Sequence, residues 1–161
     1  MLACVRRKSM MNPAWRVLSA PLIGLFVLAG CGGKDEPKLP TAAEAGVTLK
    51  DHVTRTLDGA LGKDLKVTDP GGKDVPCTEG KVKRTYAAKA RDSFYSGDSN
   101  LTLLAMIGSL GKVAEYDLTS SNSSDTYQEA TNKDLHLRIV LSAPDKGSMV
   151  VRGETECLPA R

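Results

Sequence analysis

Aromatic residues are scarce in this sequence of 161 residues, at 4% of the chain. Beyond position 31 the aromatic residues are Tyr86, Phe94, Tyr95, Tyr116 and Tyr127, which are too few and too scattered to stack nucleotide bases. The chain beyond residue 30 also lacks an excess of cations. Four of the 22 Lys and Arg lie in the first thirty residues, and the other 18 are balanced by 19 Asp and Glu. Because phosphate neutralisation needs clustered cations, the sequence argues against a nucleic-acid binder.

Catalytic motifs are also missing from the sequence. It contains no phosphate-binding loop, HExxH motif or EF-hand loop, and Gly108-Ser109-Leu110-Gly111 does not have the spacing of a nucleophile elbow. There are two histidines. We expect His52 on the surface of a helix and His136 on the solvent side of a strand. The sequence therefore favours a protein that is not an enzyme and that uses no metal or cofactor.

The longest apolar stretch is too short to cross a membrane. Residues 17–30 form an uncharged run of fourteen, whereas a spanning helix needs about twenty. The run follows Arg6, Arg7, Lys8 and Arg16. A basic start followed by a short apolar core is typical of a signal peptide, so we expect residues 1–30 to be removed on export.

The end of this segment carries a more specific motif. Leu28-Ala29-Gly30-Cys31 resembles the lipobox of bacterial lipoproteins. The resemblance implies cleavage between Gly30 and Cys31 and a thioether-linked lipid on Cys31. Two or three acyl chains, at about 0.8 kcal/mol per buried methylene, make a stable anchor, which would hold the chain on the extracytoplasmic side of the cell membrane. A plain secreted protein is the open alternative.

The chain after Cys31 divides into a tether and one domain. Residues 32–40, GGKDEPKLP, contain little to bury and predict a flexible tether, so residues 31–40 hold the lipidated Cys and the tether. Residues 41–161 have the length of a single domain. The arrangement resembles small exported lipoproteins of actinobacteria, including a Cys77-Thr78-Glu79-Gly80-Lys81 segment and a terminal Gly153-Glu154-Thr155-Glu156-Cys157. That resemblance implies an envelope location and no particular activity.

Two cysteines are left for the exported domain once Cys4 leaves with the signal and Cys31 carries lipid. In an oxidising compartment, Cys77 and Cys157 most simply form one disulfide. A metal pair or a redox pair are the alternatives, but there is no CxxC spacing to support them.

Hydrophobic periodicity predicts two helices and a series of strands. One helix spans Thr48 to a C-cap at Gly62, with Thr41 and Glu44 as an earlier possible start. A second runs from Ser99 to Gly111, with Leu101, Leu104, Ile107 and Leu110 as its buried face. Strands are expected at 65–68, 81–91, 113–119 and 126–131, separated by turns at 69–74 and 120–125, and a β-hairpin at 135–157. This order predicts an α+β two-layer sandwich, an antiparallel sheet of about four to five strands with two helices on one face.

The polar side of that sheet is the candidate binding face. Alternation places a set of cations opposite the core positions. They are Lys81, Lys83, Lys89, Arg91, Arg138 and Arg152. Such a surface suits a non-catalytic module that binds an envelope protein or an anionic envelope polymer.

Two alternative functions remain open. The first is a carrier that holds a small apolar ligand between the helices and the sheet, in a cavity lined by Leu57, Leu104, Ile139 and Val151. The second is a small hydrolase, which would need His52 or His136 to meet a Ser or carboxylate in space.

Overall fold

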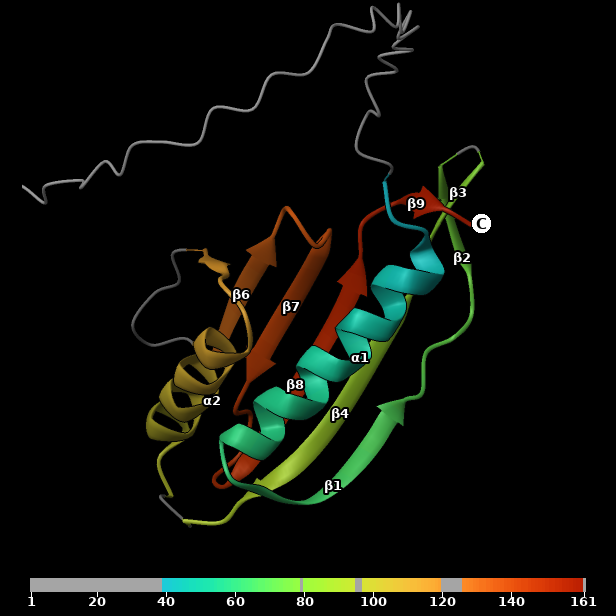
Figure 1. Cartoon of the computed structure of the whole chain (residues 1–161). Helices are drawn as coiled ribbons and strands as arrows, with labels where there is room; N and C mark the ends of the chain where they lie inside the picture. Colours follow the sequence, from blue (N-terminus) through green and yellow to red (C-terminus); the bar gives the residue numbers. More distant parts are fainter. Residues whose placement is uncertain (1–38, 79, 95–96, 120–125, 161) are drawn as a thin grey trace, which may run out of the picture. The chain divides into compact units, whose positions relative to one another are not determined.

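The computed structural model of the chain describes residues 39–78, 80–94, 97–119 and 126–160. The expected signal peptide, the lipobox, Cys31 and the expected turn at 120–125 lie outside the described residues. Two helices, α1 (Ala42–Gly59) and α2 (Ser99–Val113), cover one face of an antiparallel sheet (Figure 1). The prediction of an α+β two-layer sandwich is confirmed, with more strands than the four to five expected.

The main sheet has six strands in the order β1-β4-β8-β7-β6-β5. Their bounds, in chain order, are β1 Gly62–Asp69, β4 Thr85–Asp92, β5 Asp117–Leu118, β6 Tyr127–Asn132, β7 Leu137–Ser142 and β8 Ser148–Thr155. A smaller sheet has the order β2-β3-β9, formed by Val75–Thr78, Lys81–Lys83 and Leu158–Pro159. All neighbouring strands are antiparallel.

Helix α1 begins at the earlier of the two expected starts. The Thr41 hydroxyl accepts a hydrogen bond from the Glu44 amide (3.2 Å), and the Glu44 carboxylate accepts one from the Thr41 amide (2.8 Å). This reciprocal capping box satisfies two amides that otherwise lack partners, so the expected start at Thr48 is wrong. The C-cap is Ala60 rather than Gly62, and the left-handed residue that reverses the chain is Leu61 (φ 60°).

Helix α2 buries only part of the face that the spacing predicts: Leu110 is buried and Ile107 packs against the core, but Leu101 and Leu104 do not. Leu101 and Leu104 are 55% and 61% exposed, whereas Leu103, Met106 and Leu110 are buried. The segment is apolar on every side, so spacing alone does not decide its orientation. A buried hydrogen bond from the Thr102 hydroxyl to the Asp92 carboxylate (3.0 Å) helps to fix the observed one. The helix also continues past Gly111 to Val113.

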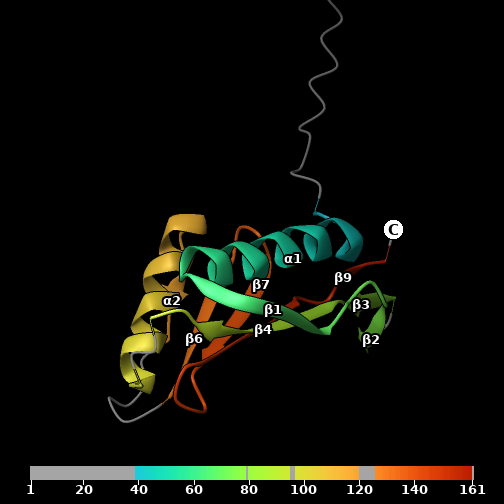
Figure 2. The ribbon, with the colours of Figure 1, turned by 90° about the horizontal axis from the view of Figure 1, so that it is seen from below.

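The core lies between the helices and the main sheet (Figure 2). Its fully buried side chains come from α1, α2 and the central strands. They include Leu49, Val53, Leu57, Met106, Leu110, Ile139, Leu141, Met149 and Val151. Full burial of each such side chain contributes about 1.5–3 kcal/mol relative to exposure.

The strand expected over 81–91 is interrupted. Arg84 separates β3 from β4, which belong to different sheets. At the break, the Arg84 amide donates to the Thr155 hydroxyl (3.0 Å), and the Arg84 carbonyl accepts from the Thr155 amide (2.9 Å). Three smaller differences concern strand bounds. Strand β1 is longer than expected, and the strand expected at 113–119 is reduced to Asp117–Leu118. Strand β9 was not expected.

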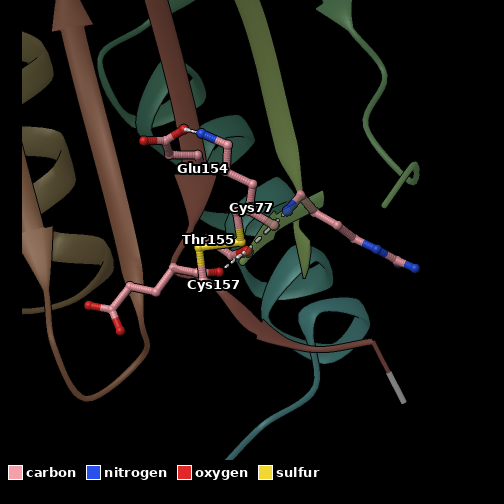
Figure 3. Close-up of a disulfide and its surroundings, with 7 residues drawn as sticks. Cys77, Glu154, Thr155 and Cys157 are labelled. Carbon is pink, nitrogen blue, oxygen red and sulfur yellow. Dashed lines mark hydrogen bonds and ion pairs between the residues drawn. A yellow bond between two sulfur atoms is a disulfide. The ribbon is translucent and has the colours of Figure 1, made fainter. Parts of the chain in front are cut away.

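A disulfide joins Cys77 in β2 to Cys157, which follows β8 (Figure 3). The two Cα atoms are 6.1 Å apart. The bond closes a loop with a sequence separation of 80 residues, for which loop-closure entropy gives a stabilisation of up to about 4–5 kcal/mol. It therefore holds the small sheet to the end of a central strand of the main sheet.

Candidate functional site

The side of the main sheet away from the helices is the candidate binding surface. Both helices lie on the same side of the sheet (Figure 2). The strand register and the burial pattern place alternate side chains of β4, β7 and β8 on the other side. We call this side the open face. From these three strands it presents Thr85, Ala87, Lys89, Arg91, Arg138, Val140, Ser142, Ser148, Val150, Arg152 and Glu154. The buried residues of the same strands, such as Ala88, Ile139 and Val151, alternate with them.

One half of the open face is a network of ion pairs, which we call the Arg138 cluster. The Arg138 guanidinium donates through Nε and Nη2 to the two carboxylate oxygens of Glu129 (2.6 and 2.7 Å) and through Nη1 to Glu154 (3.2 Å). Lys83 Nζ donates to the other oxygen of Glu154 (2.8 Å). Two cations thus meet two carboxylates, and the cluster is electrically neutral.

These contacts shift the pKa values of the cluster's residues so that their charged forms are favoured. The hydrogen bond from Lys83, with a second from Arg138, holds the pKa of Glu154 below its usual value. The hydrogen bonds from Arg138 likewise lower the pKa of Glu129, and those carboxylates raise the pKa of Arg138. The cluster therefore stays ionised at neutral pH.

A depression of about 510 Å³ lies beside the Arg138 cluster. Its lining includes Arg138, Val140, Arg152, Glu154 and Asp69. Arg152 is exposed and stands between the small or apolar positions Ala87 and Val140 of the neighbouring strands. Its guanidinium has no ion-pair partner within the described part of the chain.

The other half of the open face is a second depression, of about 600 Å³, which we call the basic corner. Four cations line it, Lys66 from β1, Lys89 and Arg91 from β4, and Lys146 from the β7–β8 turn. The carboxylate in the lining is Asp64, which forms an ion pair with Arg91 and accepts from Arg91 Nε at 2.9 Å. That contact lowers the pKa of Asp64. The lining therefore carries an excess of positive charge.

The six cations expected to share one face do not form one surface. Lys89 and Arg91 lie in the basic corner, whereas Arg138 and Arg152 line the other depression and Lys83 reaches it from β3. Lys81 is exposed on β3 of the small sheet, paired with Thr78 and Pro159, because the chain breaks at Arg84. Lys66 and Lys146 were not predicted at this face, because they join it only through the pairing of β1 with β4 and through the β7–β8 turn.

The two histidines are placed differently from the expectation. His52 is buried, 7% exposed, and its Nδ1 is 2.8 Å from the hydroxyl of Tyr116. Burial lowers the pKa of His52 and raises that of Tyr116. His136 lies in the turn before β7 with φ 56°, and its Nδ1 is 2.7 Å from a Glu156 carboxylate oxygen. The two imidazoles therefore do not share a partner: His52 contacts Tyr116, and His136 contacts Glu156.

The residues proposed to line an apolar carrier cavity do not share one space. Leu57, Ile139 and Val151 are packed in the core, and Leu104 is exposed on the outer side of α2. Within the described residues we find no group of three or more His, Cys, Asp or Glu side chains that could bind a metal ion. The helices of the described chain are also too short or too polar to cross a membrane.

Comparison of the chain with protein-family models, with curated proteins and with solved structures finds no match. The open face is therefore interpreted from its own chemistry.

Proposed function

We propose that the protein is a lipid-anchored module of the bacterial cell envelope that binds a partner without catalysis through the open face of its sheet. The anchor part of the proposal is supported by the sequence Leu28-Ala29-Gly30-Cys31 after a short apolar core and by the polar residues 32–40 that follow. Cys31 would carry the lipid, and residues 32–40 would join it to the domain.

The observation that carries the binding part is the open face itself. A six-stranded sheet with helices on one side presents two depressions on the other, and both are lined by charged side chains. Such a surface suits a polar or charged partner better than an apolar ligand.

The direction in which the chain enters the domain supports the same interpretation. The described chain runs from Leu39 into α1, and α1 packs on the side of the sheet opposite the open face (Figure 2). A tether that enters through the helical layer leaves the open face accessible.

Intact mass and membrane fractionation of the wild-type chain and of Cys31→Ser test the anchor. We expect a wild-type mass that begins at Cys31 and includes lipid, and we expect Cys31→Ser to lose both the lipid and its membrane retention. A lipid-free wild-type protein recovered in the medium would contradict the anchor.

Site-specific photocrosslinking in cells tests the binding face. A photoreactive residue at Val140, on the open face, should give adducts with an envelope component. The matched control is Val47, which is 71% exposed on α1. Adducts from Val47 but not from Val140 would contradict a role for the open face.

A further inference from the structure

We infer that the basic corner binds an anionic polymer that carries closely spaced phosphate groups. The inference rests on the proposed function, because it names the class of ligand that the open face would bind in the cell envelope. Binding itself can be measured on the purified chain, whether or not that chain is lipidated.

The first argument is uncompensated charge. The lining of the basic corner contains four cations and one carboxylate, Asp64, which is already held by Arg91. The side chains of Lys66, Lys89 and Lys146 are exposed, and among the described residues none of the three has an ion-pair partner. This differs from the Arg138 cluster on the same face, where cations and carboxylates are matched in number.

The second argument is the way these charges are paired across the sheet. Lys66 on β1 lies directly opposite Lys89 on β4, with both side chains in the same depression. Like charges directly opposite each other destabilise a sheet. On the same face, Glu154 lies directly opposite Arg138, which is the favourable arrangement. A bound anion between Lys66 and Lys89 would remove the repulsion, so the pair is suited to a ligand-bound state.

The spacing of the charges favours a polymer over a single small anion. Neighbouring strands are about 4.8 Å apart and alternate residues on one strand about 6.6 Å apart, so at the backbone Lys66 and Lys89, and Lys89 and Arg91, are each separated by less than a Debye length of about 8 Å. Their potentials therefore add. The corner is an open depression beside β1, the edge strand, which lets an extended chain pass across it. Ammonium groups bind phosphate as point charges, and the Ser148 hydroxyl in the lining adds a hydrogen-bond donor.

The position of the corner argues against the lipid headgroups of the anchoring bilayer as the ligand. The tether would enter at Thr41, at the start of α1, whereas β1 and the corner follow the end of α1 at Gly59. The 18 residues of α1 span about 27 Å. Helix α1 also packs on one side of the sheet (Figure 2), and the outward positions Lys66, Lys89 and Arg91 place the corner on the opposite side. It therefore lies on the part of the domain remote from the point of attachment.

The experiment measures binding of long-chain inorganic polyphosphate to the purified full-length chain, as the bacterial host processes it, over a range of salt concentrations. The test variant is Lys66→Gln with Lys89→Gln. The matched control is Lys112→Gln with Lys133→Gln, which removes the same charge from exposed lysines on α2 and in the β6–β7 turn. Melting temperatures verify that both variants fold, and loss of the like-charge pair should leave the test variant no less stable than the wild type.

We expect the test variant to lose at least tenfold in affinity and the control to stay within about twofold of the wild type. The salt dependence should fall by about 1.4–1.8 in log–log slope, as expected for two lost phosphate contacts. An equal loss in the control would overturn the inference, because binding would then follow net charge. Equally tight binding of polyglutamate would overturn the assignment to phosphate. Tighter binding to vesicles of phosphatidylcholine and phosphatidylglycerol in equal parts would overturn the polymer in favour of a membrane surface.

Failure of this experiment is distinguishable from failure of the proposed function. A wild-type chain that is lipidated at Cys31 and crosslinks from Val140 but does not bind polyphosphate retains the envelope module and loses the basic corner as its site. A chain that binds polyphosphate through Lys66 and Lys89 but carries no lipid retains the basic corner as a binding site and loses the membrane anchor.

Discussion

Substitution of Gly153 by Ala tests how closely α1 approaches the sheet. Gly153 lies in the middle of β8, beneath α1, and a Cβ atom placed there would collide with Leu49 Cδ1. It would also lie 3.1 Å from the Arg138 carbonyl oxygen and 3.3 Å from Ile139 Cγ1. Two of these three neighbours are fully buried side chains, and the third is backbone. Relief requires either a change of rotamer of Leu49, which is fully buried, or a movement of α1 away from the sheet.

The magnitude follows from two opposing effects. An extra methyl group in a well-packed core costs about 1–3 kcal/mol, and replacing a strand glycine by alanine returns about 0.5–1 kcal/mol of chain entropy. We expect a net loss of about 1–2 kcal/mol in the free energy of unfolding. With a slope of about 2 kcal/mol per molar urea, the midpoint of urea denaturation, followed by circular dichroism, falls by about 0.5–1 M.

Gly108→Ala is the matched control for Gly153→Ala. Gly108 lies within α2, and a Cβ atom there would have nothing within 4 Å, so the same substitution should stabilise the chain by about 0.5–1 kcal/mol. In a Leu49→Ala background the collision at position 153 is removed, and Gly153→Ala should then cost little or nothing. If the effects of the two substitutions simply added, Leu49 would not be the obstacle and the reasoning would be refuted.

Three further predictions concern stability. Ser109→Ala should raise the free energy of unfolding by about 1 kcal/mol in urea denaturation, because the Ser109 hydroxyl is buried without a hydrogen-bond partner among the described residues; a loss would indicate a missed partner. Lys83 and Arg138 hold the pKa values of Glu154 and Glu129 below their usual 4.5, so the stabilisation by the Arg138 cluster is complete above that pH and is lost as the pH falls through the lowered values. Melting temperatures from about pH 2 to pH 7 should therefore fall more steeply below pH 4.5 for the wild type than for Arg138→Gln, and parallel curves would contradict this. Reduction of the disulfide between Cys77 and Cys157 should lower the free energy of unfolding by up to about 4–5 kcal/mol, whereas the double Ser variant should not respond to reductant; unchanged wild-type melting would refute the role of the bond.

Where a local signal was decisive, the sequence predicted the fold well. The alternation of Leu137, Ile139 and Leu141 identifies β7, and the pairing of Thr41 with Glu44 marks the true start of α1. The buried face of α2 was predicted correctly at Ile107 and Leu110 and wrongly at Leu101 and Leu104, because a largely apolar helix has no preferred side until its neighbours are known. The break at Arg84 depends on a hydrogen-bonded contact with Thr155, 71 residues away, which no local pattern reveals.

The candidate site was only partly predictable for the same reason. Lys89 and Arg91 follow from the alternation within one strand. Lys66 and Lys146 join them through the pairing of β1 with β4 and through the β7–β8 turn, which brings together residues 80 positions apart in the chain. The neutralisation of Arg138 also required the structure, because Glu129 and Glu154 come from the two strands on either side of it.

The alternation of side chains along the central strands separates core positions from surface positions within one backbone. In β4 the inward residues Ala88 and Ala90 maintain the fold, while Lys89 and Arg91 point away from it. Substitutions at the outward positions can change the charge of the open face without disturbing the core. The charge of this surface can therefore change while the architecture stays constant, provided that tightly packed positions such as Gly153 are retained.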